Sequence, residues 1–110
     1  MRMRKKKWAR PEVDDCPYFL QEPTINKDKW KDYFSNNNPI YLELGCGKGS
    51  FISQIASKNR DINFIAIDLK DDMLGYARRK IEEAYKHNNI DNVVLLAYDI
   101  ERIRRRNWRE

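Results

Sequence analysis

Three glycines in this sequence have the spacing of a loop that brings a ligand against the main chain. Gly45, Gly47 and Gly49 lie between an apolar run that predicts a short buried strand and a segment that predicts a helix. Glycine adopts backbone angles that other residues avoid, and its missing side chain lets a ligand approach closely. The N-terminus of the following helix adds unpaired N–H groups and a partial positive charge. A binding loop is therefore expected at residues 43–49.

Three carboxylates narrow the choice of ligand. Glu43 precedes the glycines, and Asp68 and Asp99 follow the ends of two further predicted strands. Ligands of open parallel sheets bind at the carboxyl ends of the strands, so we expect the three side chains to surround the loop. Glu43 would repel a pyrophosphate but could hold an ammonium group, and Asp68 could accept both hydrogen bonds of a ribose diol. S-adenosylmethionine carries an ammonium, a ribose diol and an adenine, one group for each carboxylate.

Other interpretations of the same residues stay open. A dinucleotide fingerprint beginning at Gly45 would need glycine at position 50, where Ser50 stands, and the P-loop spacing is absent. A nicotinamide-dependent oxidoreductase is therefore a disfavoured alternative. Glu43 could only order the loop, and Asp68 or Asp99 could cap a helix, since Asp is common there. A zinc site is not expected, because the two cysteines form no CxxC pair and the chain has one histidine.

The elements that must position these residues alternate along residues 39–100. We expect strands at roughly 40–44, 63–67 and 93–97, and helices at 50–59 and 71–88, the second one capped by Asp71 or Asp72. One face of the first helix would bury Phe51, Ile52, Ile55 and Ala56. Apolar strands that alternate with helices predict an α/β fold with a parallel sheet, and right-handed crossovers predict the strand order 3-2-1.

The net positive charge of the chain lies in its two end segments. Residues 1–12 hold six Lys or Arg against one Glu, whereas residues 13–100 have a net charge of −3. We interpret residues 1–12 as an extended basic arm, 13–38 as irregular chain followed by a short amphipathic helix at 26–34, and 101–110 as an Arg-rich tail. The arm could contact RNA phosphates and stack on a base. The predicted RNA contacts are Arg2, Arg4, Lys5, Lys6, Lys7, Trp8 and Arg10.

Composition places the chain among ordinary globular proteins. Its 110 residues correspond to one domain or part of one, and 41% hydrophobic content is enough for a core. No apolar run approaches the length of a membrane span, and no signal peptide pattern is present. We therefore expect a soluble, cytoplasmic protein that binds neither a membrane nor a metal.

The sequence resembles the bacterial tRNA (guanine-N7-)-methyltransferases over most of its length. The similarity lies in the opening MRMRKKKWA, in a W-x-x-x-F helix followed by N-P-I, and in the segments ELGCGKGSFI, FIAID and LLAYD. The resemblance implies a Rossmann-like class I methyltransferase fold and S-adenosylmethionine bound at Glu43, Gly45, Gly47, Asp68 and Asp99. It also implies methyl transfer to guanine in the variable loop of tRNA. The attacked ring nitrogen carries no proton, so the reaction requires no general base.

One family feature is absent from this sequence. In the family the chain continues through further strands, one of which ends in a PDPW-like motif that contacts substrate and cofactor, and no such motif occurs here. Catalytic residues are therefore left unassigned. We expect this chain to be the front half of the fold, inactive alone, with its first strand as an unpaired edge through which it could form a homodimer. A basic RNA-binding module without catalysis is the alternative.

Overall fold

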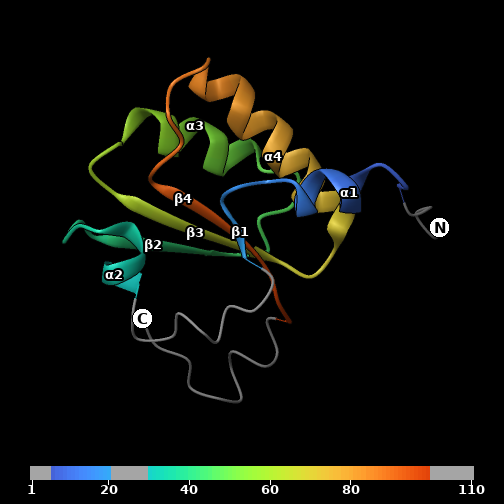
Figure 1. Ribbon diagram of the computed structural model, residues 1–110, viewed down its shortest axis with the longest axis horizontal. Coiled ribbons are helices and arrows are strands. Elements are labelled where there is room, and N and C mark those ends of the chain that lie inside the picture. Colours follow the sequence, from blue (N-terminus) through green and yellow to red (C-terminus); the bar gives the residue numbers. More distant parts are fainter. Residues whose placement is uncertain (1–5, 21–29, 100–110) are drawn as a thin grey trace.

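The chain folds around one parallel sheet. The computed structural model describes residues 6–20 and 30–99. In chain order the elements are α1 (Ala9–Asp14), β1 (Phe19–Leu20), α2 (Trp30–Phe34), β2 (Ile40–Leu44), α3 (Ser50–Lys58), β3 (Asn63–Asp68), α4 (Asp71–Tyr85) and β4 (Val93–Ala97). Figure 1 shows α1, α3 and α4 together on one side of the strands and α2 on the other. The structure therefore has the layers of an α/β fold.

The strand order is β1-β4-β3-β2, and every neighbouring pair is parallel. The three long strands thus confirm the predicted order 3-2-1. The prediction of irregular chain at residues 13–38 is wrong for Phe19 and Leu20, which pair with Leu95 and Leu96 as β1. A strand of only two residues has too short a pattern to be found by periodicity.

Burial explains which strands are central. Every residue of β3 except Asp68 is buried, and so is every residue of β4 except Ala97. Strands covered on both faces need such continuous apolar runs. In contrast, β2 is an edge strand, and its Tyr41 and Leu44 side chains are 41% and 44% exposed. The prediction that the first long strand is an edge is confirmed for the described residues.

Two apolar cores lie on the two faces of the sheet. The larger core joins α1, α3 and α4 to one face through residues such as Val13, Ile52, Leu74 and Ile81. The smaller core joins Trp30 and Phe34 of α2 to the other face. The part of the predicted amphipathic helix that the structure describes, Trp30–Phe34, is confirmed, and residues 26–29 lie outside the described residues.

Several predicted details are wrong. Residues 9–14 form α1 and pack on α4, whereas we expected an extended arm. Neither Asp71 nor Asp72 caps α4, because Lys70 is its N-cap and both carboxylates bind the N-terminal segment. The helix ends at Tyr85, since Lys86 and His87 have positive φ angles of 49° and 73°. Phe51 is 51% exposed, because the neighbour of its ring is Tyr41 of the edge strand β2, which is itself 41% exposed.

Candidate functional site

The predicted site lies where β2, β3 and β4 end together. In the sheet register Leu44 pairs with Ile67, and Asp68 pairs with Ala97. The loop after β2 continues the ladder, because the N–H groups of Gly45 and Cys46 both donate to the carbonyl of Ile67, at 2.8 and 3.0 Å. The end of β2, with the loop that follows it, therefore lies beside Asp68. Asp99 is half-buried and stands two residues beyond the end of β4.

The glycine loop is packed tightly on one side and open on the other. Gly49 has a φ of 81°, and a Cβ there would lie 2.6 Å from the Cα and Cβ of Ala77 in α4. Only glycine permits this approach between the loop and the helix. Gly47 also has a positive φ, 55°, but a Cβ on Gly47 would meet no atom within 4 Å. The main chain at Gly47 therefore faces open space that a ligand can enter.

Asp68 connects this loop to the start of α4. Its Oδ2 accepts a hydrogen bond from the N–H of Gly47 at 3.2 Å, and its Oδ1 accepts one from the N–H of Lys70 at 3.0 Å. Because a carboxylate has about four acceptor positions, both oxygens keep capacity for hydroxyl donors. The structure thus gives Asp68 an ordering role in the loop and leaves it able to bind a ligand.

Glu43 carries a buried carboxylate oxygen at the end of β2. Its Oε1 is buried and has no hydrogen-bond partner among the described residues. Burial disfavours the charged form and raises the pKa of Glu43 above its ordinary value. The nearby Cys46 is buried too, and burial together with the charges of Asp68 and Glu43 raises its pKa to about 12. The thiol is therefore protonated at neutral pH, which fits a small loop residue and not a nucleophile.

These observations test what the site can hold. A buried acceptor without a donor is costly, so Glu43 suits a ligand that brings a cationic N–H group. Asp68 adds acceptor capacity, and the open main chain at Gly47 adds an N–H edge without side-chain obstruction. Two carboxylates beside the loop disfavour a pyrophosphate. The residues present fit a nucleoside that bears an ammonium group.

The predicted RNA contacts divide into two groups. Arg2, Arg4 and Lys5 lie outside the described residues. Lys7 is exposed, and the N–H of Lys6 donates to both oxygens of Asp72, at 3.1 Å each. The side chains of Trp8 and Arg10 have partners inside the protein, which the sequence did not reveal. That any of these residues contacts RNA stays a prediction.

Trp8 and Arg10 bind helix α4 and its neighbours. The Trp8 ring meets Tyr76 edge-on at 5.1 Å, and the guanidinium of Arg79 lies 3.6 Å from the centre of the Trp8 ring. Arg10 forms ion pairs with Asp14 at 2.9 Å and with Asp71 at 3.0 Å. Sequence reasoning missed the contacts with Tyr76, Arg79 and Asp71, because each of these partners lies more than sixty positions away in the chain.

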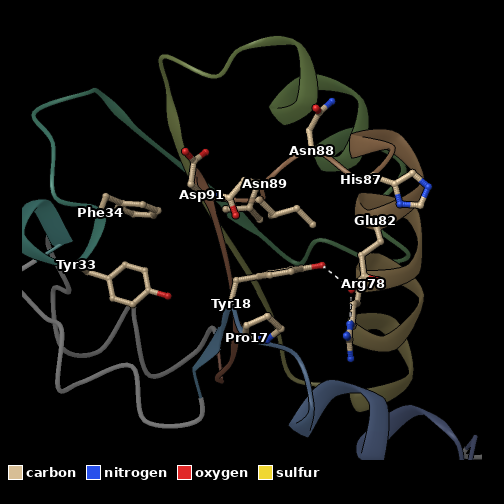
Figure 2. Close-up of a pocket in the computed structure, with 12 residues that line it drawn as sticks. Pro17, Tyr18, Tyr33, Phe34, Arg78, Glu82, His87, Asn88, Asn89 and Asp91 are labelled. Atoms are coloured by element: carbon tan, nitrogen blue, oxygen red, sulfur yellow. Dashed lines mark hydrogen bonds and ion pairs between the residues drawn. The ribbon is translucent and has the colours of Figure 1, made fainter.

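A pocket lies at the end of the strands opposite to the glycine loop. The pocket has a volume of about 610 Å³ and opens beside Tyr18, which precedes β1, and the loop from His87 to Asp91, which precedes β4. Figure 2 shows the hydroxyl of Tyr18 directed toward Glu82, to which it donates a hydrogen bond at 3.4 Å. Glu82 is paired with Arg78 at 2.6 Å, and Asp91 with Arg60 at 2.8 Å. This pocket contains none of the predicted site residues.

The described part of the chain has neither a cluster of metal-binding side chains nor a membrane-spanning helix. Within residues 6–20 and 30–99, no three His, Cys, Asp or Glu side chains gather as a metal ion would require. None of the helices described there has the length and apolar character to cross a membrane.

Comparison with known proteins places the chain among methyltransferases. Residues 37–106 match the protein family described as "Putative methyltransferase". Three relatives named tRNA (guanine-N(7)-)-methyltransferase, from Clostridium botulinum, Clostridium beijerinckii and Acetivibrio thermocellus, are 57%, 58% and 50% identical to this chain. They match 91%, 91% and 96% of it, over 47%, 47% and 49% of their own length. The chain therefore spans about half the length of these curated relatives.

A solved structure agrees with the fold. The protein described as "Structure of an antibiotic related Methyltransferase" superposes with a TM-score of 0.54, at 21% identity, over 68% of this chain and 37% of its own. At this identity the likeness supports the architecture alone, a parallel α/β sheet of the methyltransferase type.

Proposed function

Because the chain belongs to the methyltransferase family that it matches, we propose that it forms the S-adenosylmethionine-binding half of a tRNA (guanine-N7-)-methyltransferase. The names of its relatives, at 50–58% identity over more than nine-tenths of this chain, support the proposal. Half the length of those relatives has no counterpart in this sequence. The proposed reaction and RNA substrate therefore belong to the whole protein.

The buried, unpartnered oxygen of Glu43 is the observation that carries the cofactor assignment. In our proposal Glu43 holds the ammonium of the amino-acid part of S-adenosylmethionine, and Asp68 accepts hydrogen bonds from the ribose. Gly45 and Gly47 let the cofactor approach the main chain, and Asp99 lies at the adenine. When bound, the cofactor supplies a methyl group on a sulfonium, which needs no activation by an acid.

The protein's contribution to such a transfer is placement. The ring nitrogen of guanine that accepts the methyl carries a lone pair and no proton, so no residue has to remove one. Holding two reactants in line converts a bimolecular step into an effectively unimolecular one, which can supply about 7–11 kcal/mol of the barrier. We assign no catalytic side chain in this half.

The exposed edge of β2 supports a second proposal, a homodimer. Unpaired N–H and C=O groups on an edge strand are a template for another strand. Next to this edge lie the exposed side chains of Tyr41, Leu44 and Phe51. We propose that β2 of one chain pairs with β2 of a second copy. Sedimentation analysis tests this, and a strictly monomeric chain at 100 µM, on the order of the concentration that a weak dimer needs, would contradict it.

Calorimetric titration separates the candidate cofactors. We expect the 110-residue chain to bind S-adenosylmethionine and not NAD. Binding of NAD alone would favour the oxidoreductase alternative. Binding of tRNA without either cofactor would favour the alternative of a basic RNA-binding module. We expect no transfer of a radiolabelled methyl group to tRNA by this chain alone, and detectable transfer would contradict the view that the second half is required.

A further inference from the structure

Four lysines gather beside the glycine loop, and we propose that they form a binding surface for an RNA sugar–phosphate backbone. We call this surface the lysine face, and its members are Lys6, Lys7, Lys48 and Lys80. The proposal rests on the proposed function, because it identifies how a tRNA would be held next to the methyl donor. It also gives Trp8 a role other than stacking on a base.

A notch in α4 fixes the N-terminal part of the lysine face. A Cβ on Gly75 would lie 2.9 Å from the Trp8 ring and 3.1 Å from the Cβ of Ala9. The missing side chain of Gly75 therefore makes the space in which Trp8 and Ala9 sit. The N–H of Lys6 is bound to Asp72, one turn earlier on α4. These contacts hold Lys6 and Lys7 at the start of α4, directly after the strand end that carries Asp68.

Aromatic and polar contacts connect the loop to the same place. The Tyr76 ring contacts the Trp8 ring edge-on, with 5.1 Å between the ring centres. The ammonium of Lys48 lies 5.1 Å from the centre of the same Tyr76 ring. The ammonium of Lys80, one helical turn after Tyr76, donates to Oγ of Ser50 at 2.5 Å. Lys48 belongs to the glycine loop and Ser50 is the first residue of α3. The lysine face thus borders the site proposed for the cofactor.

The carboxylates around the N-terminal segment bind groups other than the lysine ammonium groups. Glu12 is paired with Arg79 at 2.6 Å and Asp71 with Arg10 at 3.0 Å, and Asp72 accepts hydrogen bonds from the main-chain N–H of Lys6. Among residues 6–20 and 30–99, none of the four lysine ammonium groups forms an ion pair with a carboxylate. Cations that are not paired with a carboxylate, next to aromatic rings, favour a nucleic-acid backbone.

The arrangement also assigns Trp8 as a positioning residue. The Arg79 guanidinium covers the Trp8 ring at 3.6 Å, and Glu12 holds that guanidinium through two hydrogen bonds, at 2.9 and 2.6 Å. A base that stacked on this side of the ring would have to displace the arginine from both partners. Trp8 therefore acts by anchoring the lysines that precede it.

The test measures the affinity of the 110-residue chain for an unmodified tRNA transcript across a series of NaCl concentrations. We expect Lys7→Gln, Lys48→Gln and Lys80→Gln each to weaken binding about fivefold at 0.1 M salt and to reduce the salt slope by about one. Gly75→Ala changes no charge and is expected to weaken binding by displacing Trp8. The matched controls are Lys31→Gln in α2 and Lys58→Gln at the end of α3, both exposed, which we expect to stay within about twofold.

Three outcomes would overturn the inference. Equal losses in the test and control variants would mean that binding follows total charge and not this surface. No loss in any variant would remove the lysines from the interface. Lysine-dependent binding to phosphatidylserine vesicles, without binding to the transcript, would mean that the partner is a membrane surface.

A cofactor titration keeps this inference separate from the proposed function. The double variant Lys7→Gln, Lys80→Gln should bind S-adenosylmethionine as the unchanged chain does, because neither residue is assigned to the cofactor. If the unchanged chain binds no S-adenosylmethionine, the proposed function fails. If it binds the cofactor but the lysine variants behave like the controls, only the lysine face fails.

Discussion

Replacement of Gly75 by alanine tests whether the N-terminal segment is docked on α4. Docking predicts that the change destabilises the chain, whereas helix propensity alone predicts that it stabilises the chain. In an exposed helix interior this change stabilises by about 1 kcal/mol, because glycine is the poorer helix former. Here the added Cβ would lie 2.9 Å from Trp8 and 3.3 Å from the Cα of Ala9, both closer than ordinary contact. Overpacking of this kind costs about 1–3 kcal/mol. We therefore expect Gly75→Ala to destabilise the chain by about 1 kcal/mol overall.

Urea unfolding, followed by far-UV circular dichroism, gives the change in unfolding free energy. A second variant, Trp8→Ala, removes the ring that the new methyl group would meet. In that background the tight contact with Ala9 remains and offsets the gain in helix propensity, so Gly75→Ala should cost nearly nothing. This corresponds to a coupling free energy of about 1 kcal/mol between positions 8 and 75. A pair of substitutions at Glu83, exposed on α4, calibrates the helix, because Glu83→Ala and Glu83→Gly differ by propensity alone.

Residues 6–9 would not be docked as described if Gly75→Ala stabilised the chain by as much as the difference in stability between Glu83→Ala and Glu83→Gly. A cost of Gly75→Ala that is unchanged by Trp8→Ala would place the clash elsewhere.

Three further predictions concern the site and its support. Gly47→Ala should cost about 1–2 kcal/mol of stability, because Gly47 has a positive φ, although the added Cβ would meet no neighbouring atom. The same change should weaken S-adenosylmethionine binding in calorimetry. Unchanged affinity would refute the view that the cofactor enters the open space at Gly47. Because burial raises the pKa of Glu43, its ionisation disfavours the fold, so the free chain should lose stability as the pH rises from the ordinary Glu value of about 4.3 through the raised pKa. Cofactor binding needs ionised Glu43, so the affinity for S-adenosylmethionine should fall as the pH drops through that same pKa. Glu43→Gln should abolish the pH dependence of both stability and cofactor affinity, and persistence of either would implicate another group. Asn92→Ala should lower the unfolding free energy, measured in urea, by about 2–4 kcal/mol, because the buried amide donates to three carbonyls at 3.0, 3.1 and 3.2 Å. The control Asn88→Ala, at an exposed position, should have little effect. Equal effects of the two changes would refute the structural role of Asn92.

The sequence was sufficient to predict the three long strands of the sheet, though not β1. Strands β3 and β4 are covered on both faces, so they appear in the sequence as uninterrupted apolar runs between helical patterns. The order of the three long strands then follows from the handedness of the crossovers. The meeting of Glu43 and Asp68 at one edge follows in turn from that order, since parallel strands end on the same side.

The N-terminal segment was not predictable in the same way. Six residues of α1 have little helical preference of their own, and the segment is held by partners 60 or more positions later, such as Asp72 for Lys6 and Asp71 for Arg10. A tryptophan among lysines suits stacking on a base as well as packing in a notch. The space at Gly75 favours packing of Trp8 on α4, and only the folded structure shows that space.

The helical pattern also predicted too much burial for one residue of α3, Phe51. Helical spacing placed Phe51 with Ile52 and Ala56 on one buried face, but only the latter two are fully covered. Periodicity reports which side of a helix faces the sheet and not where the sheet stops. Phe51 stays half exposed beside Tyr41 of the edge strand β2, which is itself 41% exposed.

Titration of S-adenosylmethionine into the unchanged chain and into Glu43→Gln tests most directly whether this end of the sheet is a methyl-donor site. We expect binding that weakens about tenfold or more when the carboxylate is replaced by an amide, since a charge-assisted hydrogen bond contributes about 1.5–3 kcal/mol. The control Glu83→Gln removes the same charge on the outer face of α4 and should bind as the unchanged chain does. Equal affinities of Glu43→Gln and the unchanged chain, or no binding by either, would contradict the assignment.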